Sequence, residues 1–225
     1  MDKNLEQPLV SIVVPVYDFP GGLELAKRNL DSIDAQDYEN LEVVITDDSD
    51  DNVYSALTSE YRVNYARNYG PKGMAYNTNH GIDNAKGELI KILFQDDFFS
   101  APDSLRSMVQ HLTPTYNWLA SGCYHTVDGT NLINYHAPFY SHSENTIGSP
   151  SVTLFRNQPD IRFNTNFHWV LDLDLYRKLM RKYGKPKILE TPNVVIGLHE
   201  QQMTHKLTDE RKFQEFLLLE MQNYE

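Results

Sequence analysis

The most constraining feature of this chain is a short apolar run that stops at two adjacent carboxylates. Residues 89–94 are mostly apolar, and Gln95, Asp96 and Asp97 follow them directly. A run of this length predicts a buried strand, and residues 98–103 predict the opening of a helix. In an open α/β sheet, ligands bind at the carboxyl ends of the strands. The stretch is equally consistent with a turn in which an aspartate caps the next helix.

Two earlier segments follow the same plan. Residues 9–17 form a β-branched run interrupted near its end by Pro15, and residues 41–46 run straight into Asp47 and Asp48. Apolar residues at helical spacing over 22–35 place an amphipathic helix between the two strands. Strands that alternate with helices indicate right-handed crossovers. The sequence therefore predicts an α/β fold, with a Rossmann-like, mainly parallel, doubly wound sheet flanked by helices.

The second part of the chain has a different pattern, in which short strands alternate with polar loops. No internal repeat or low-complexity linker is present, so we expect a single domain over residues 1–225. We expect a nucleotide-binding half at about 9–111 and a smaller second half at about 112–225. The further predicted elements are helix 53–58, strand 62–66, helix 74–85, strands 118–125, 132–136 and 151–155, helix 171–183, strand 187–196 and helix 208–223.

Charge and cysteine content exclude several kinds of function. The chain has 31 acidic and 20 basic residues and a net charge of −11, which opposes nonspecific binding to nucleic acid or to an anionic membrane surface. A single cysteine, Cys123, excludes an intrachain disulfide and a multi-cysteine zinc site. The first apolar run is too short to span a bilayer. We therefore expect a cytoplasmic protein without nucleic-acid binding or membrane insertion.

Four motifs in order carry a family resemblance. They are residues 14–17 closing the first strand, 46–49 closing the second, 73–79 followed by 85–88, and 94–97. Together they resemble family 2 of the inverting glycosyltransferases, which has the GT-A, or nucleotide-diphospho-sugar transferase, fold. The resemblance is strong over residues 9–100 and thinner beyond, and it implies that the half at about 112–225 binds the acceptor. The chain departs from the family pattern in two places: Ser49 follows the Asp pair without an intervening glycine, and Gln95 replaces the first acid of the longer metal motif.

The resemblance implies a UDP-sugar or dTDP-sugar donor. Asp48 would accept a hydrogen bond from the imide N–H of uracil or thymine, which cytosine lacks. Pro15, Val16 and Tyr17 would form the wall against the base and ribose, and Lys72 would approach the base or the phosphates. Each residue also has an ordinary alternative: Asp48 as a helix cap, residues 15–17 as a simple strand end, and Lys72 as a solvated side chain.

The resemblance also implies a divalent cation, Mn²⁺ or Mg²⁺, because carboxylate oxygens are hard ligands. Asp97 would bind the cation directly, and Asp96 would hold the ribose hydroxyls or share the metal. His199 is the best candidate for a later ligand and would favour Mn²⁺; the alternative is a structural histidine. The cation would stabilise negative charge on the leaving diphosphate.

An inverting transfer also needs a base that takes the proton of the acceptor hydroxyl. Asp172 best matches the position of the family's base, and Asp174 is the runner-up, because alternate residues on a helix cannot both face one acceptor. Phe167, His168 and Trp169 beside it could stack on a sugar ring. The alternative is that both acids simply favour the positive end of a helix.

The leading hypothesis is thus a metal-dependent inverting glycosyltransferase that transfers a sugar to a hydroxyl of a glycan or glycosylated acceptor. A sugar-nucleotide nucleotidyltransferase is a second hypothesis, although residues 17–22 lack the Lys or Arg that would grip a triphosphate. A non-catalytic nucleotide-binding or sugar-binding module is a third. A dehydrogenase is excluded because no Gly-X-Gly-X-X-Gly follows the first strand.

Overall fold

The computed structural model describes residues 7–202 and 206–222 of the 225-residue chain. Its strands are β1 (Val10–Val16), β2 (Leu41–Asp47), β3 (Asn64–Arg67), β4 (Leu89–Ile92), β5 (Phe98–Phe99), β6 (Trp118–Thr126), β7 (Ile133–His136), β8 (Thr153–Arg156) and β9 (Lys187–Gly197). Its α-helices are α1 (Gly22–Asp34), α2 (Met74–Asn84), α3 (Ser104–Gln110), α4 (Leu171–Tyr183) and α6 (Asp209–Glu220), and its 3₁₀ helices are η1 (Val53–Ser59) and η2 (Pro150–Val152).

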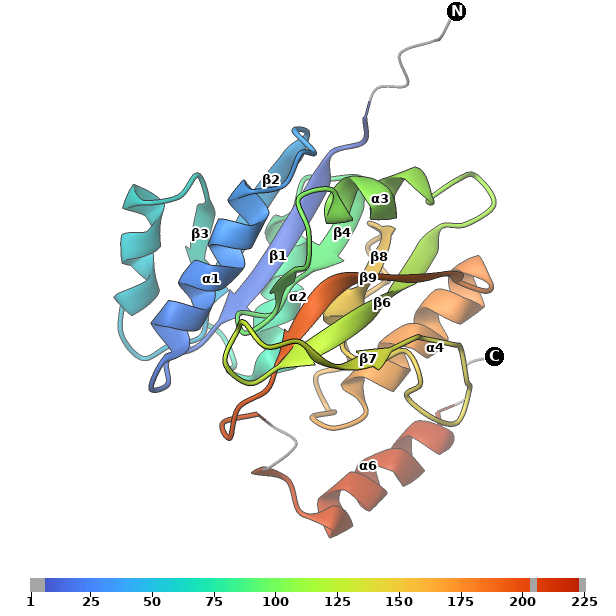
Figure 1. Ribbon diagram of the computed structural model, residues 1–225. Helices are drawn as coiled ribbons and strands as arrows, with labels where there is room; N and C mark the ends of the chain where they lie inside the picture. Colours follow the sequence, from blue (N-terminus) through green and yellow to red (C-terminus); the bar gives the residue numbers. More distant parts are fainter. Residues whose placement is uncertain (1–6, 203–205, 223–225) are drawn as a thin grey trace, which may run out of the picture.

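The strands form one sheet in the order β3-β2-β1-β4-β8-β6-β9-β5, with β7 paired to β6. The pairs β2–β3, β1–β2, β1–β4 and β6–β9 are parallel, whereas β8, β5 and β7 run antiparallel to their neighbours. Figure 1 shows α1 and α3 on the near side of the sheet, α2 and α4 behind it and α6 below it. The predicted doubly wound, mainly parallel α/β sheet is confirmed.

No helix within the described ranges has the length and apolar character needed to cross a membrane.

Most predicted elements begin and end within about two residues of the observed bounds, and the differences have local causes. Residues 53–58, predicted as a helix, lie in the 3₁₀ helix η1, where Ser55, Thr58 and Ser59 hydroxyls bond to carbonyls three residues earlier. Such local bonds compete with α-helical pairing. Residues 150–152 form η2, so β8 begins later than predicted. The predicted end of the last helix, Asn223, lies outside the described residues.

The prediction that residues 98–99 open a helix is wrong, because they form strand β5. Phe98 and Phe99 pair antiparallel with Val195 and Val194 of β9, because the chain turns back across the sheet edge directly after the Asp pair. A strand of two residues is too short to show a periodic pattern. This pairing brings the ends of β4 and β9 together, although the two strands are not neighbours in the sheet.

Small and polar residues hold helix α2 close to the sheet, as its composition predicts. A Cβ atom on Gly81 would lie 2.4 Å from Val13 Cγ1 and 3.1 Å from Thr46 Oγ1. Asn77 Nδ2 donates to the carbonyl oxygens of Val16 and Thr46, each at 2.9 Å. The helix therefore binds the carboxyl ends of β1 and β2 through direct contacts with their backbone.

The substitution Gly81→Ala is expected to reduce the free energy of unfolding by about 1 kcal/mol. Alanine gains about 1 kcal/mol of helix propensity, but overpacking against a close-packed strand costs roughly 1–3 kcal/mol. Urea denaturation measures the difference. Asn84→Ala, at the exposed end of the same helix, is the matched control and should stay within about 0.5 kcal/mol of the wild type. A stabilised Gly81→Ala protein would contradict the close approach of α2 to β1.

Candidate active site

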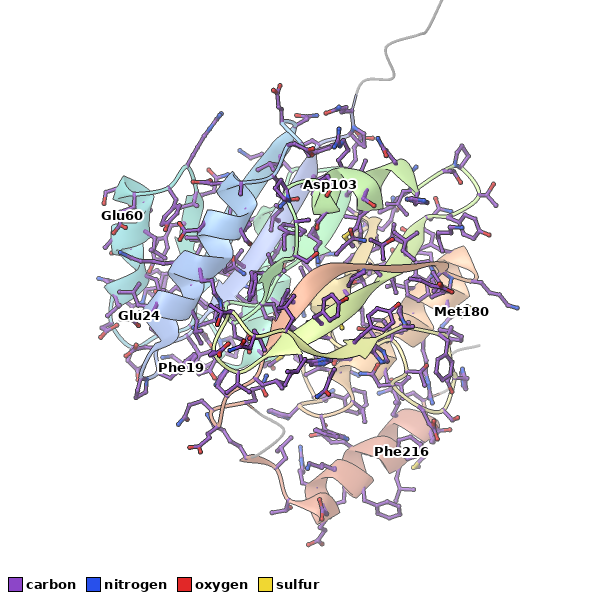
Figure 2. All side chains as sticks on the ribbon, viewed as in Figure 1. Phe19, Glu24, Glu60, Asp103, Met180 and Phe216 are labelled. Carbon is purple, nitrogen blue, oxygen red and sulfur yellow. The ribbon has the colours of Figure 1, made fainter. Side chains whose placement is uncertain are left out.

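A cleft of about 980 Å³ lies at the edge where β1, β2 and β4 end. Figure 2 labels two residues that line it, Phe19 after β1 and Phe216 on α6, at opposite sides of the lower part of the view. All predicted site residues except Val16 line this one cleft. These residues are Pro15, Tyr17, Asp48, Lys72, Asp96, Asp97, Asp172 and His199.

Val16 does not form the wall that the sequence predicts. Its side chain is fully buried, as is every residue of the central strand β1, and it points to the face opposite to that of Pro15. Its backbone carbonyl instead accepts hydrogen bonds from Asp48 N at 3.0 Å and Asn77 Nδ2 at 2.9 Å. Pro15 and Tyr17, on either side of it, line the cleft.

Asp48 closes a loop at the end of β2. One carboxylate oxygen accepts from Asn68 Nδ2 at 2.9 Å and the other from Gly73 N at 2.6 Å. The alternative role as a helix cap is not observed, because Asn52 precedes η1 and makes no side-chain cap bond. A carboxylate has about four lone-pair positions, so Asp48 can accept a further hydrogen bond from a ligand in the cleft.

Lys72 forms an ion pair with Asp50 across the mouth of the cleft. Asp50 is fully exposed and Lys72 is about half exposed, so the pair is screened by solvent and contributes little to stability. Lys72 therefore keeps the freedom to turn toward a bound anion.

Gln95 has a structural role that explains the departure from the family's acidic motif. Its side chain is buried, and Oε1 accepts from Tyr17 N at 2.7 Å. Its Nε2 donates to Gly22 O at 3.3 Å and to Tyr54 Oη at 3.2 Å. A carboxylate has no N–H donor for the Gly22 carbonyl. The amide thus holds the loop that follows β1 in place.

Asp96 and His199 face each other at the rim. His199 Nε2 lies 3.1 Å from Asp96 Oδ2, and Gln202 Nε2 donates to the same oxygen at 3.3 Å. The ring of Phe19 stacks on His199 at a centroid distance of 5.0 Å and an interplanar angle of 10°. The structure therefore pairs His199 with Asp96, and not with Asp97.

Asp97 is almost completely buried. Oδ1 accepts from Gly197 N at 3.0 Å, and Oδ2 accepts from Ser149 Oγ at 3.5 Å. Burial, and secondarily the charge of Asp96, raise the pKa of Asp97 well above its usual value. A cation at this position would offset both effects.

Sequence reasoning missed Lys91, which is fully buried in β4 near Asp97. Its ammonium donates to Ile92 O at 3.1 Å and to Ser151 O. Burial lowers the pKa of Lys91 to about 7, and the charge of Asp97 opposes that shift. The signal was visible in the sequence as a single lysine within the otherwise apolar run 89–94.

The fit of these residues to a divalent cation follows from their donor atoms. Within residues 7–202 and 206–222, no group of three His, Cys, Asp or Glu side chains is arranged to hold a metal ion. Mg²⁺ at nucleotide sites, however, is commonly bound by one or two carboxylates together with phosphate oxygens and water. Asp96, Asp97 and His199 offer carboxylate and imidazole donors at one rim, so the set fits a cation shared with a diphosphate.

The two candidate bases, Asp172 and Asp174, both lie in the first turn of α4 but have different surroundings. Asp172 lines the cleft, and Asn145 Nδ2 lies 3.4 Å from its Oδ2. Burial raises the pKa of Asp172 to about 7. Asp174 is completely buried and pairs with Lys178 at 2.7 Å, outside the cleft lining. Asp172 is thus the carboxylate of this helix that can meet a ligand.

A second residue that sequence reasoning missed is Glu215 of α6. Its fully buried carboxylate accepts from the backbone N–H groups of His168 at 2.8 Å and Trp169 at 2.6 Å. These two residues immediately precede α4 and line the cleft. More than 40 residues separate Glu215 from them in the sequence, so no local pattern could have shown the contact.

Two solved glycosyltransferase structures resemble this fold. The crystal structure of S. aureus TarS 1–349 in complex with UDP-GlcNAc superposes with a TM-score of 0.74 at 18% identity, over 93% of this chain and 65% of that one. The mannosyltransferase PcManGT from Pyrobaculum calidifontis, in complex with GDP-Man and Mn²⁺, superposes with a TM-score of 0.62 at 20% identity, over 89% and 59%. The fold is therefore the GT-A fold.

Two relatives illustrate the sequence similarity. An uncharacterised glycosyltransferase of Rickettsia typhi is 32% identical over 100 residues, which are 44% of this chain and 30% of that protein. The putative colanic acid biosynthesis glycosyl transferase WcaA of Escherichia coli is 24% identical over 212 residues, 87% of this chain and 75% of that protein. The chain thus spans less than a third of the rickettsial relative.

The family profile described as "Glycosyl transferase family 2" matches residues 11–180. The match includes β1, β2, β4, the Asp pair and the start of α4. Because it extends over well more than half of the sequence, the chain belongs to glycosyltransferase family 2.

Proposed function

We propose that this protein transfers a sugar from a UDP-sugar, or a dTDP-sugar, to a hydroxyl of a glycan or glycosylated acceptor. The transfer proceeds with inversion and requires Mn²⁺ or Mg²⁺. The observation that carries the proposal is the single cleft that Asp48, Asp97 and Asp172 line together. They come from the end of β2, the turn after β4 and the first turn of α4. The complexes of TarS with UDP-GlcNAc and of PcManGT with GDP-Man support a nucleotide-sugar donor.

The donor binds at the end of the cleft formed by β1 and β2. Asp48 accepts the imide N–H of the base, and the bonds from Asn68 and Gly73 hold its carboxylate in position. Tyr17 and Pro15 lie beside the base and ribose, since both line this side of the cleft. Lys72 approaches the diphosphate from the mouth.

Asp97 would hold the divalent cation, and Asp96 and His199 would lie at the same rim. When bound, it supplies charge stabilisation for the leaving diphosphate, so the protein needs no general acid. The Mn²⁺ in the PcManGT complex supports a divalent cation in the proposed reaction. Asp97 keeps its orientation through Gly197 N.

Asp172 is the base on the opposite side of the sugar. It takes the proton of the acceptor hydroxyl as that oxygen attacks the anomeric carbon. Its raised pKa suits a base that must accept a proton near neutral pH. Asn145 and the start of α4 hold the carboxylate toward the cleft.

The substitution Asp172→Asn should lower the transfer rate by roughly 10²- to 10⁴-fold, which is the usual contribution of a general base. UDP affinity should remain close to that of the wild type, because Asp172 does not touch the nucleotide. Radiolabelled sugar transfer and UDP calorimetry measure the two quantities. Asp174→Asn, in the same helix turn, is the control and should keep its rate per folded molecule. Full activity of Asp172→Asn would remove Asp172 from the mechanism.

The transfer rate should rise with pH and level off above about 7, since Asp172 must be deprotonated to act and its pKa is about 7. Rates at saturating donor and Mn²⁺ across the range of about pH 5.5 to 8.5 test this expectation. UDP affinity, measured over the same range, separates the titration of Asp172 from changes in metal binding. A transfer rate that does not change with pH would contradict the assignment. The same rise with pH in the residual activity of Asp172→Asn would contradict it as well.

UDP should bind at least roughly tenfold more tightly with Mn²⁺ than with EDTA, because Asp97 would hold the cation and the cation would offset the negative charge of the diphosphate. Asp97→Asn should lose this difference while keeping the acceptor for Gly197 N. Asp48→Asn should instead weaken UDP similarly under both conditions. Titration calorimetry gives all the affinities. If Asp97→Asn keeps the full difference in UDP affinity between Mn²⁺ and EDTA, the metal assignment is refuted. Tight UDP binding by the wild type without sugar transfer would indicate a non-catalytic binding module.

A further inference from the structure

Trp169 is the aromatic side chain next to the candidate base. It stands three positions before Asp172, lines the cleft and is 38% exposed. Large aromatic side chains are usually buried, and a half-exposed indole in a cleft offers a flat apolar surface to a ligand. This surface therefore lies in the part of the cleft lined by the start of α4, where Asp172 stands.

The backbone at Trp169 is fixed by α6. Glu215 Oε2 accepts from His168 N and Trp169 N, and Arg211 Nε donates to Glu215 Oε1 at 3.2 Å. Burial opposes the charged form of Glu215, but the backbone and charged partners outweigh it and lower its pKa. A buried carboxylate with this many donors is a rigid anchor. The indole is thus attached to a preorganised segment.

One part of the indole surface is already covered. Lys212 Nζ lies 4.5 Å from the centroid of the Trp169 ring, and Lys212 does not line the cleft. The cation therefore packs on the ring from the α6 side and leaves the remaining indole surface toward the cleft. Such a contact stabilises one orientation of the ring.

The charge at this end of the cleft is negative. Glu144 and Asp172 line it, and the lysines among the described lining residues lie toward the donor end. Lys72 pairs with Asp50, and Lys206 Nζ lies 5.8 Å from the centroid of the Tyr17 ring. Lys212, the cation packed on the ring, lies 3.7 Å from Asp209 Oδ1 and does not line the cleft. An anionic group in the cleft beside Trp169 would therefore meet the carboxylates of Glu144 and Asp172 without a cation from the lining.

On the basis of the proposed function, we propose that Trp169 is the stacking platform for an uncharged sugar ring of the acceptor. The apolar C–H face of a pyranose packs on the indole, while the attacking hydroxyl reaches Asp172. The acceptor is accordingly a neutral glycan, and not a uronic acid or a phosphorylated sugar. No covalent step beyond the transfer itself is involved.

The chain contains two tryptophans, which makes a direct test possible. Trp118 is fully buried, so acrylamide quenching of fluorescence reports chiefly on Trp169. The probes are the neutral methyl β-glucoside, methyl β-galactoside and methyl N-acetyl-β-glucosaminide, and the anionic methyl β-glucuronide. The glucuronide differs from the glucoside only at C6. Each is titrated with and without UDP and Mn²⁺. Trp169→Phe, which lacks the reporter, gives the background from Trp118.

At saturation, at least one neutral glycoside should reduce the acrylamide quenching of Trp169 fluorescence by about twofold. If that glycoside is the glucoside, the glucuronide should bind at least about tenfold more weakly than it does. Trp169→Ala should weaken the protein's affinity for that glycoside, measured by saturation-transfer NMR, about three- to tenfold. UDP affinity should stay unchanged. Phe213→Ala, an exposed aromatic of α6 outside the cleft lining, is the matched control and should bind the glycoside as the wild type does.

The inference is overturned if no neutral glycoside protects Trp169, or if the glucuronide protects it equally well. It is also overturned if a UDP-sugar alone gives the protection, which would place Trp169 at the donor sugar. Failure of the wild type to bind UDP would instead refute the proposed function. Protection by a neutral glycoside without UDP would still support a sugar platform at Trp169.

Discussion

The site depends on one hydrogen bond, from the backbone N–H of Gly197 to the buried carboxylate of Asp97. It joins the turn after β4 to the end of β9, two strands that are not neighbours in the sheet. The approach is close, since a Cβ on Gly197 would lie 2.3 Å from the carbonyl oxygen of Asp96. Only glycine fits this contact without displacing the Asp pair. Burial disfavours the charged form of the Asp97 carboxylate. The hydrogen bond from Gly197 N and the nearby charge of Lys91 partly offset this effect.

A second set of contacts connects that carboxylate to the candidate base. Helix α4 holds the segment before η2 by two side chains: Tyr176 Oη donates to Gly148 O at 2.8 Å, and Arg177 donates to His142 O at 2.7 and 3.0 Å. The same segment carries Asn145, beside Asp172, and Ser149, beside Asp97. One short segment attached to one helix thus contacts both Asp97 and Asp172.

The sequence predicted what depends on short-range pattern. Strand ends that carry Asp48 and Asp97, and the helix that begins beside Asp172, follow from periodicity and turn chemistry. The direction of side chains was harder to predict. Val16 faces the core because successive residues of a strand point to opposite faces. Gln95 stabilises the loop after β1 because an amide both accepts a hydrogen bond from Tyr17 N and donates one to Gly22 O. Contacts between distant segments, such as Glu215 with Trp169, have no local signal.

The two acids of α4 show why environment, and not residue type, assigns chemistry. Both stand in the first turn, where the helix dipole favours negative charge. Lys178 neutralises Asp174 inside the protein, which makes that carboxylate a structural partner. Asp172 faces the cleft without a paired cation among the described contacts, so burial shifts its pKa upward to the range in which a base works. A two-residue step along one helix therefore separates an acid that stabilises the fold from one that is available for proton transfer.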